Sequence, residues 1–152
     1  MKFKNIFLLI LFLLFFYIFL NIKIVKNDSM SPNLRNNYIV LTNPFFSMRT
    51  GDIYGFKYNN KIYVKRLIAQ PFDIIEIKDG RIFINYLQYR SFYVNKFDRV
   101  GPLKLNKDQY FFIGDNELNS FDSRSFGSID RKDIKFKILF IIYPFNKIGF
   151  LR

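Results

Sequence analysis

The sequence contains no cysteine and no histidine among its 152 residues. Without cysteine the protein forms no disulfide, has no thiol nucleophile and cannot build a cysteine zinc site, and its redox compartment cannot be inferred. Without histidine it cannot use a Ser-His-Asp or Cys-His arrangement, and the common histidine metal sites are excluded too. These two absences exclude more chemistry than any other feature of the chain.

Acidic residues are also few, with 12 Asp and Glu against 24 Lys and Arg, which gives a formal net charge of +12. A basic surface suits nucleic acid or an anionic membrane face. However, the chain has no basic run and no recognised nucleic-acid motif. Lys, Asn, Ile, Phe and Tyr, whose codons can be A/T-rich, are abundant together, so base composition offers another explanation. We therefore expect no nucleic-acid partner.

A long apolar run stands at the N-terminus. Residues 6–20 read IFLLILFLLFFYIFL, and NIKIV extends the run to Val25. At 1.5 Å per residue this run makes about 30 Å of helix, enough to cross a bilayer. The expected plan is a short cytoplasmic N-terminus at 1–5, a transmembrane anchor at 6–25 and a folded domain at 26–152.

A removable signal peptide is the alternative interpretation of this run, because Lys2 and Lys4 precede it. The following stretch NIKIVKND contains no small-x-small cleavage site, which favours an uncleaved anchor. Lys23 can extend its ammonium group to the lipid headgroups. Charge does not determine the orientation, because Lys23 and Lys26 balance the two lysines before the run.

Ser29 follows the run, in the stretch KNDSMSPNL at 26–34. An extended chain spans at most about 3.6 Å per residue, so Ser29 is expected within roughly 15 Å of the anchor's end at Val25. Any chemistry that Ser29 performs then takes place at the membrane surface. A nucleophilic serine needs a base, and without histidine that base must be Lys, Asp, Glu or Tyr.

After residue 30 the sequence consists of short β-like runs separated by turn residues. Asn59-Asn60 and Asp79-Gly80 predict hairpin turns. The pattern indicates one mostly β domain of about 125 residues. The expected strands are YIVL (38–41), DIYGFKY (52–58), KIYVKRLIA (61–69), DIIEIK (73–78), RIFINY (81–86), QYFFIG (109–114) and KFKILFIIY (135–143).

Lys65 is the lysine best placed to be a base. A lysine accepts a proton only when neutral, and burial in apolar surroundings can lower its pKa from about 10.4 by as much as about 3–5. Lys65 lies inside the apolar stretch IYVKRLIA and by alternation shares a strand face with Tyr63 and Leu67. From the strand alone, an outward lysine on an amphipathic strand is the simpler interpretation.

Four motifs together resemble, in order and spacing, those of bacterial type I signal peptidase, and the preceding anchor matches as well. The resemblance covers nearly the whole chain from the anchor onward. The last motif is the most specific, because GDN followed by NS-x-DSR-x-x-G rarely arises by chance. The motifs are SMSPNL (29–34), GDIYGF (51–56), YVKRLIAQPFD (63–73) and GDNELNSFDSRSFG (114–127).

The resemblance implies an antiparallel β-sheet catalytic domain of the signal peptidase type, anchored by one N-terminal transmembrane helix. It implies that Ser29 is the nucleophile and Lys65 the general base, which takes the hydroxyl proton and returns it to the leaving amine. Ser120 corresponds to the family's second serine, whose hydroxyl binds and orients the lysine amine. An ordinary polar turn residue is the alternative interpretation of Ser120.

Four charged residues correspond to structural positions near the family's site. Arg66 is expected to pair with Asp115, and Arg124 with Asp122 or a nearby group, because buried charges require partners. We interpret these residues as a scaffold for the two catalytic side chains.

The resemblance also places the oxyanion hole and the substrate pocket. The backbone N–H of Ser29 is the family's first oxyanion donor, and Asn27 stands where a hydroxyl residue is the second, so its amide is the candidate donor. The pocket for the residue before the scissile bond admits small side chains, which implies an Ala-x-Ala type of cleavage site. The residues expected to line it are Met30, Leu34, Tyr63 and Val64.

Three positions depart from the family pattern. Ala69 and Phe72 replace glycines in AQPFD, and Tyr86 replaces the glycine of a usual Asn-Gly. If these positions require φ > 0, their turns have to be rebuilt. The stretch from Arg66 to Gly114 is also short, so the large inserted subdomain of some relatives is expected to be absent or minimal.

The predicted function is a membrane-anchored serine endopeptidase that removes signal peptides from exported preproteins after small residues, through an acyl-enzyme. The expected partners are those signal peptides and membrane lipid, and no metal or organic cofactor is implied. The expected location is the cytoplasmic membrane, with a single pass and the catalytic domain on the outer, periplasmic or extracellular, face. The alternatives are a specialised relative that matures one substrate, such as a conjugative pilin, and a catalytically silent β module that binds a partner or an anionic lipid surface.

Overall fold

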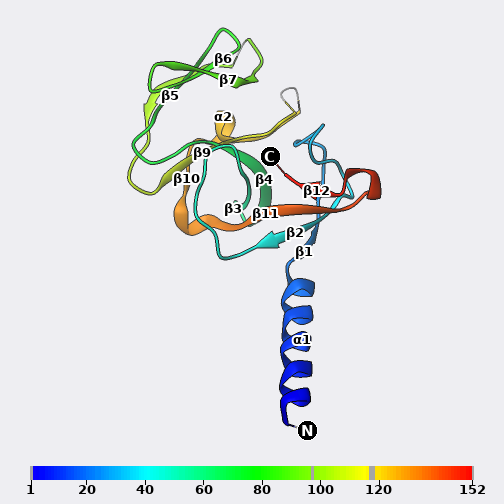
Figure 1. Cartoon of the computed structure of the whole chain (residues 1–152). Helices are drawn as coiled ribbons and strands as arrows, with labels where there is room; N and C mark the ends of the chain where they lie inside the picture. The colour runs from blue at the N-terminus through cyan, green and yellow to red at the C-terminus, as the bar shows by residue number, and fades with distance from the viewer. Residues whose placement is uncertain (1, 97, 117–118, 152) are drawn as a thin grey trace.

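The computed structural model describes residues 2–96, 98–116 and 119–151. Figure 1 shows an N-terminal helix that stands apart from a β-rich domain. The elements are α1 (Lys2–Leu20), β1 (Ile22–Ile24), β2 (Ile39–Asn43), β3 (Ile53–Tyr58), β4 (Lys61–Ala69), β5 (Ile74–Lys78), β6 (Arg81–Ile84), β7 (Leu87–Tyr93), β8 (Val100–Lys104), β9 (Gln109–Ile113), α2 (Ser123–Phe126), β10 (Ile129–Asp130), η1 (Arg131–Asp133), β11 (Ile134–Tyr143), η2 (Phe145–Lys147) and β12 (Gly149–Phe150).

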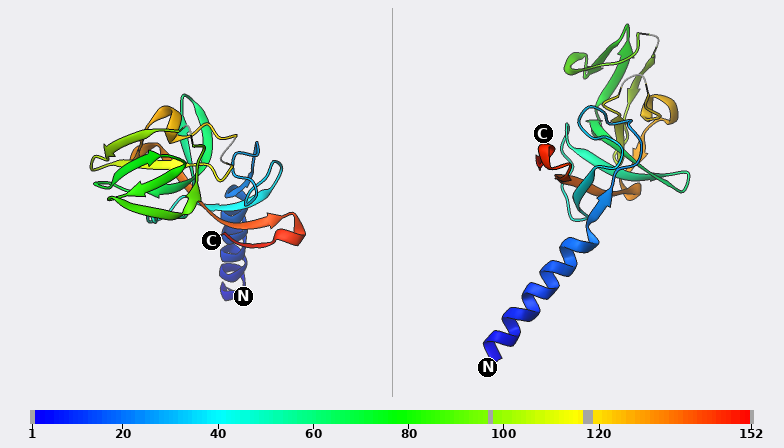
Figure 2. Two further views of the ribbon diagram at one scale, coloured as in Figure 1. Left: turned by 90° about the horizontal axis from the view of Figure 1, so that it is seen from above. Right: turned by 90° about the vertical axis from the view of Figure 1, so that its right-hand side faces the viewer.

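Two antiparallel sheets make up the domain, which confirms the predicted fold class. The larger has eight strands, in the order β1-β2-β11-β3-β4-β9-β10 with β12 paired to β11. The smaller has four, in the order β7-β6-β5-β8, and is inserted in the chain between β4 and β9. It lies at the end of the domain farthest from α1 (Figures 1 and 2). This small sheet occupies the stretch in which the sequence predicted an absent or minimal inserted subdomain.

The N-terminal apolar run divides into a helix and a strand, so the predicted helix over 6–25 is wrong at its C-terminal end. α1 ends at Leu20, and β1 pairs antiparallel with β2, Lys23 opposite Val40. Two β-branched isoleucines favour the strand, and pairing with β2 satisfies its backbone groups. The stretch Phe3–Leu20 is still long and apolar enough to cross a membrane, and none of it is buried against the domain.

Helix and sheet meet at Asn21, which alone separates α1 from β1. Its side chain donates to the carbonyl oxygen of Tyr17 at 2.8 Å. Its own carbonyl oxygen accepts from both the backbone N–H and the hydroxyl of Thr42 in β2, each at 2.8 Å. Tyr17 in turn donates its hydroxyl to Asn43 at 3.3 Å. The joint is therefore bonded on its helix side and on its sheet side.

All seven predicted strands are present, with ends shifted by a few residues. The predicted turns Asn59-Asn60 (φ 45° and 61°) and Asp79-Gly80 (φ 51° and 73°) are confirmed as two-residue hairpin turns. The sequence pattern did not predict β1, β7, β8, β10 and β12, of which β10 and β12 have only two residues each.

Two of the three glycine-replaced positions take a positive φ without glycine. Phe72 and Tyr86 adopt φ values of 72° and 68°, the left-handed region that favours glycine. Their side chains are 65% and 73% exposed, so neither ring gains burial there. Ala69 differs, because it lies fully buried in β4.

Candidate active site

A short loop between β1 and β2 carries Ser29. Three buried apolar side chains, Val25, Met30 and Leu34, hold this loop in one core cluster. The backbone N–H of Val25 donates to the carbonyl of Tyr38 at 2.8 Å, and that of Leu34 to the carbonyl of Met30 at 2.8 Å. Ser29 is only half-buried, so its hydroxyl is held on a fixed loop and reachable from outside.

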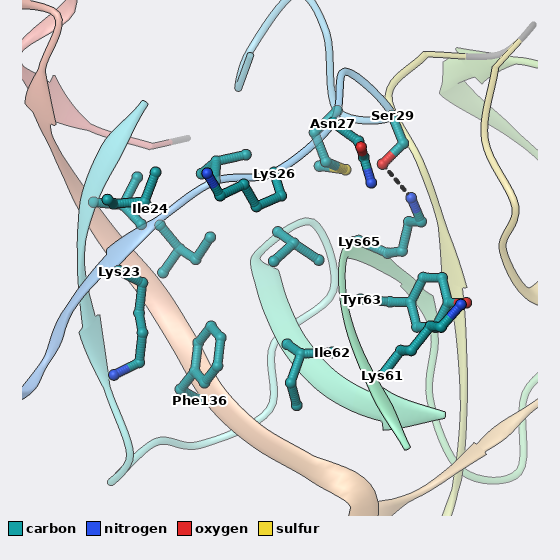
Figure 3. Close-up of a pocket in the computed structure, with 15 residues that line it drawn as sticks. Lys23, Ile24, Lys26, Asn27, Ser29, Lys61, Ile62, Tyr63, Lys65 and Phe136 are labelled. Atoms are coloured by element: carbon teal, nitrogen blue, oxygen red, sulfur yellow. Dashed lines mark hydrogen bonds between the residues drawn. The ribbon is translucent and has the colours of Figure 1, made fainter. Parts of the chain in front are cut away.

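Lys65 lies in β4, directly opposite Tyr54 of β3. Its side chain is almost fully enclosed, 2% exposed, so the interpretation as an outward surface lysine is wrong. The Nζ of Lys65 donates a hydrogen bond to the Oγ of Ser29 (Figure 3). The structure thus brings the two residues together across 36 positions of sequence.

The surroundings of Lys65 favour its neutral form. Burial lowers the pKa of Lys65 from 10.5 to about 8. Asp122 acts against this and raises the pKa, Arg124 lowers it, and Asp115 raises it. A lysine with a pKa near 8 is neutral in a useful fraction of molecules close to neutral pH.

Ser120 donates its hydroxyl to the Oδ2 of Asp122 at 2.6 Å. The structure brings Ser120 to the site, but it shows this bond and not the expected one to Lys65 among the residues described. The lysine-orienting role of Ser120 remains a prediction. The hydroxyl oxygen keeps its lone pairs, so it is still able to accept a hydrogen bond from the amine.

Asp122 is fully buried beside Ser120, and its side chain caps the N-terminus of α2. It accepts from the backbone N–H of Gly114 at 2.9 Å and from two guanidinium nitrogens of Arg124, both at 2.8 Å. Burial opposes the charge, yet the hydrogen bonds from Arg124, Gly114 and Ser120 together lower the pKa of Asp122. The predicted pairing of Arg124 with Asp122 is confirmed.

Gly114 lets the two serine segments approach each other. A Cβ at this position would overlap the Oγ of Ser120 and lie 2.5 Å from the carbonyl oxygen of Ser29. Real Cβ atoms essentially never come so close. The glycine of the GDN motif is therefore required by packing, since any side chain would push the two serines apart.

Arg66 and Asp115 form the second predicted ion pair, which is confirmed. Nε and Nη2 of Arg66 donate to the two carboxylate oxygens at 2.8 and 2.5 Å, and Nη1 donates to the carbonyl of Gly51 at 2.6 Å. Asn33, from the Ser29 loop, donates to the same carboxylate at 2.7 Å. The ion pair therefore connects β4, the segment after β9 and the loop that carries the serine.

Three contributing residues were not predicted from the sequence. Asn33 has just been described, and Asn116 binds the serine loop through its backbone N–H to Ser29 O at 3.1 Å and its side chain to Asp28 O at 3.0 Å. Asp98, between β7 and β8, accepts from Nη1 of Arg124 at 2.6 Å. Asn116 stands inside the GDN motif, which was a usable signal, whereas nothing in the sequence around Asp98 pointed to the site.

Two hollows meet at Ser29 and Lys65. One, of about 470 Å³, includes the predicted pocket residues Met30, Tyr63 and Val64 in its lining, together with Asn27 (Figure 3). The other, of about 430 Å³, is more polar and is lined partly by Asp28, Asn36 and Asn119. An extended peptide that passes from one hollow to the other would cross the hydroxyl of Ser29.

Of the predicted site residues, Leu34 lies away from the hollow and Asn27 lies beside the serine. Leu34 is fully buried in the core cluster of Met30 and is not among the described residues that line the hollow. Asn27 adopts φ 72°, and Figure 3 shows its amide directed toward the Ser29–Lys65 pair. Its role as oxyanion donor remains a prediction. Glu117 and Leu118 of the last motif lie outside the described residues.

Across residues 2–96, 98–116 and 119–151, no group of three or more Asp or Glu is placed to hold a metal ion.

Comparisons with known proteins agree with the motifs. A family model described as signal peptidase, peptidase S26, matches residues 1–143. Signal peptidase I P of Bacillus subtilis subsp. natto is 35% identical, over 82% of this chain and 78% of that protein. A relative named inactive signal peptidase IA, from Staphylococcus aureus (strain MRSA252), is 29% identical, over 82% of this chain and 79% of its own length.

A solved structure supports the fold. The crystal structure of a signal peptidase I from Enterococcus faecalis V583 superposes with a TM-score of 0.52 at 24% identity. The match covers 62% of this chain and 97% of that one.

Proposed function

The chain belongs to the signal peptidase family, peptidase S26, and from this premise we propose that it is a membrane-anchored serine endopeptidase with Ser29 as nucleophile and Lys65 as general base. The observation that carries the proposal is the hydrogen bond between the enclosed amine of Lys65 and the hydroxyl of Ser29. The family removes signal peptides, and we assign the same reaction to this chain, on exported preproteins cleaved after small residues.

The first chemical step is attack by Ser29 on the scissile carbonyl. Neutral Lys65 accepts the hydroxyl proton as the Oγ–C bond forms, and the carbonyl π electrons move onto its oxygen. The backbone N–H of Ser29 and the amide of Asn27 are the donors for that oxyanion. When the C–N bond breaks, Lys65 returns the proton to the leaving amine, and an acyl-enzyme on Ser29 remains.

The second step releases the signal peptide. A water molecule attacks the acyl carbonyl, Lys65 accepts its proton, and the Ser29 oxygen leaves and takes that proton back. The lysine is neutral again at the end of the cycle. Ion pairs Arg66–Asp115 and Arg124–Asp122 hold the elements on which this exchange depends.

The apolar preference before the scissile bond follows from the hollow next to the serine. Met30 and Val64 present apolar surface close to Ser29, which favours apolar side chains there, and the restriction to small ones is carried over from the family resemblance. We place the domain outside the cytoplasmic membrane, with α1 as anchor. Because α1 ends at Leu20, the nine residues up to Ser29 allow at most about 32 Å from the helix end, in place of the shorter limit that an anchor ending at Val25 would set.

The proposal is tested by precursor processing in detergent-solubilised protein. Wild type is compared with Ser29→Ala and Lys65→Arg, and both variants are expected to lose cleavage by at least about 10³-fold, because a guanidinium stays charged near pH 7. Ser31→Ala and Lys57→Arg are the matched controls, a neighbouring serine and an exposed lysine of the adjacent strand β3. Normal processing by Ser29→Ala would refute the mechanism.

Two alternatives remain distinct outcomes of the same assay. The relative named inactive makes a catalytically silent module a candidate, and it predicts no cleavage by wild type of any precursor. A specialised relative, such as one that matures a conjugative pilin, predicts cleavage of one precursor from a panel of many. The assembled Ser29–Lys65 pair favours an active enzyme.

A further inference from the structure

Arg124 is shared by two carboxylates. Its side chain is 8% exposed and contacts Asp122 at 2.8 Å on one side and Asp98 at 2.6 Å on the other. Asp122 is fully buried, and Asp98 is 29% exposed. A single cation therefore neutralises part of the charge of two acidic groups, and its own position depends on both.

Asp98 comes from the small sheet, on the connection between β7 and β8. Its backbone N–H donates to the carbonyl of Asn95 at 2.9 Å, which forms a turn. Val94, just before that turn, is buried in the core cluster of the small sheet and donates to the carbonyl of Gly80 at 3.2 Å. The carboxylate is thus presented to Arg124 from a supported segment.

The contacts of Arg124 lead to the proposed base. Asp122 accepts hydrogen bonds from the Arg124 guanidinium, from the Gly114 N–H and from the Ser120 hydroxyl. The charges of Asp122 and Arg124 in turn influence the pKa of Lys65. The chain of contacts runs from Asp98 through Arg124 and Asp122 to the surroundings of Lys65. It connects the small sheet to Ser120 and to Gly114, which lies against the carbonyl of Ser29.

We infer that Asp98 is a positioning residue for Lys65, which acts by holding the Arg124 guanidinium and balancing its charge. The inference rests on the proposed function of Lys65. The charged groups that face Lys65 are Asp122 and Arg124, from α2 and its cap, and Asp115, after β9. Arg124 faces Asp98, whose own segment also carries Lys96 and Arg99.

The direction of the effect follows from the signs of the charges. Removal of the Asp98 charge leaves the positive charge of Arg124 less balanced, which disfavours the ammonium form of Lys65. The acidic limb of the pH–rate profile should then move to lower pH. The rate at its plateau should fall at the same time, because Arg124 shifts and the Asp122–Ser120 contact loosens.

The experiment measures kcat against pH for solubilised wild type and three Asp98 variants. Asp98→Asn keeps the shape and an oxygen acceptor but removes the charge, and Asp98→Ala removes both. We expect both variants to lower the plateau kcat about tenfold and to move the midpoint of the acidic limb to lower pH by a few tenths of a pH unit. Asp98→Glu should keep the limb in place, because it retains the charge.

Asp79→Asn is the matched control. It makes the same charge change on the same small sheet, at an exposed turn residue that contacts only Arg99 at 3.9 Å among the described ion pairs. Asparagine also tolerates its φ of 51°. This variant should match wild type both in its plateau kcat and in the pH of its acidic limb.

Several results would overturn the inference. A lower melting temperature with an unmoved limb would make Asp98 a purely structural residue, and so would an Asp98→Asn chain that does not fold. Wild-type behaviour of Asp98→Asn would show that it has no role. Ser29→Ala is assayed alongside: cleavage by that variant refutes the proposed function itself, whereas its inactivity beside a fully wild-type Asp98→Asn refutes only the present inference.

Discussion

Lys65 combines two properties that usually exclude each other in a lysine, a titratable amine and almost complete burial. Its burial was not predictable from the strand alone, because alternation is equally compatible with an outward lysine on an amphipathic strand, which was the simpler interpretation. Its partner was predictable only through the motif resemblance. No local pattern says that a strand residue at 65 meets a loop residue at 29.

The pH dependence of the rate follows from the lowered pKa of Lys65. Only the neutral amine accepts the serine proton, so kcat should rise about tenfold per pH unit below pH 8 and level off above it. Cleavage of a precursor peptide between pH 6 and pH 10, in buffers of constant ionic strength, measures this. A rate that stays flat across that range would contradict a lysine base.

The same lysine should destabilise the fold. Its folded-state pKa of about 8 lies below the ordinary 10.5, so the unfolded chain binds the proton more tightly. The penalty is complete below pH 8 and disappears as the pH rises toward 10.5. Lys65→Met should therefore raise the free energy of unfolding at pH 7 by roughly 2–3 kcal/mol, while it abolishes cleavage.

Urea unfolding of both proteins at pH 7 and pH 10 checks this prediction. The difference between Lys65→Met and wild type should be clearly smaller at pH 10. Lys61→Met, on the exposed part of the same strand, should change little at either pH. Equal stability of wild type and Lys65→Met at pH 7 would argue against a free-energy cost of burying the charged amine.

The contacts of Asp98, Asn33 and Asn116 mark the limit of sequence reasoning at this scale. Asp98 lies 26 residues from Arg124, and Asn33 lies 82 residues from Asp115. Polar residues of these types are common on surface loops. Only the tertiary arrangement selects which of them meet a buried charge.

At the scale of elements, seven strands and the two hairpin turns at Asn59-Asn60 and Asp79-Gly80 were predictable from alternation and turn residues, because those signals are local. The end of α1 was not. Between Leu20 and Val25 the run is interrupted only by Asn21 and Lys23, and hydropathy alone does not separate the end of a membrane helix from an edge strand. Pairing with β2, a contact distant in sequence, decides that Ile22–Ile24 are extended.

The left-handed turn residues Phe72 and Tyr86 offer a route to a more stable domain. A non-glycine residue in this region is disfavoured by about 1–2 kcal/mol, and both rings are mostly exposed. Phe72→Gly and Tyr86→Gly should each raise the free energy of unfolding by about 1 kcal/mol, after the greater flexibility of glycine in the unfolded chain is counted.

Phe45→Gly is the matched control, since Phe45 is 77% exposed and its φ is not positive. That change should lower stability by about 0.5–1 kcal/mol. Thermal melts followed by circular dichroism measure all three variants. Destabilisation by both Phe72→Gly and Tyr86→Gly would mean that the rings make contacts that outweigh the backbone strain.

At the scale of the whole molecule, the boundary between helix and domain lies at Asn21. A chain that lacks residues 2–20 should keep a folded domain, because α1 is not buried against it. A chain that lacks residues 2–25 should be less stable by at least about 2 kcal/mol, because it loses β1 and the buried side chain of Val25. Urea unfolding of the two truncated chains, side by side, tests this boundary. Equal stabilities would place the boundary at Val25 instead.

The hydrogen bonds at Asn21 join the end of α1 to the sheet, and we expect them to limit rotation of the domain about the end of the helix. A swivelling linker would let the domain settle at many angles to the lipid. If α1 is the proposed anchor, a tilt of the helix with the thickness of the bilayer would be passed on through these bonds to the sheet and to Ser29. In the proposed enzyme, bilayer thickness therefore steers the height and angle at which the serine meets an emerging preprotein, and cleavage becomes sensitive to lipid composition without any lipid touching the catalytic pair.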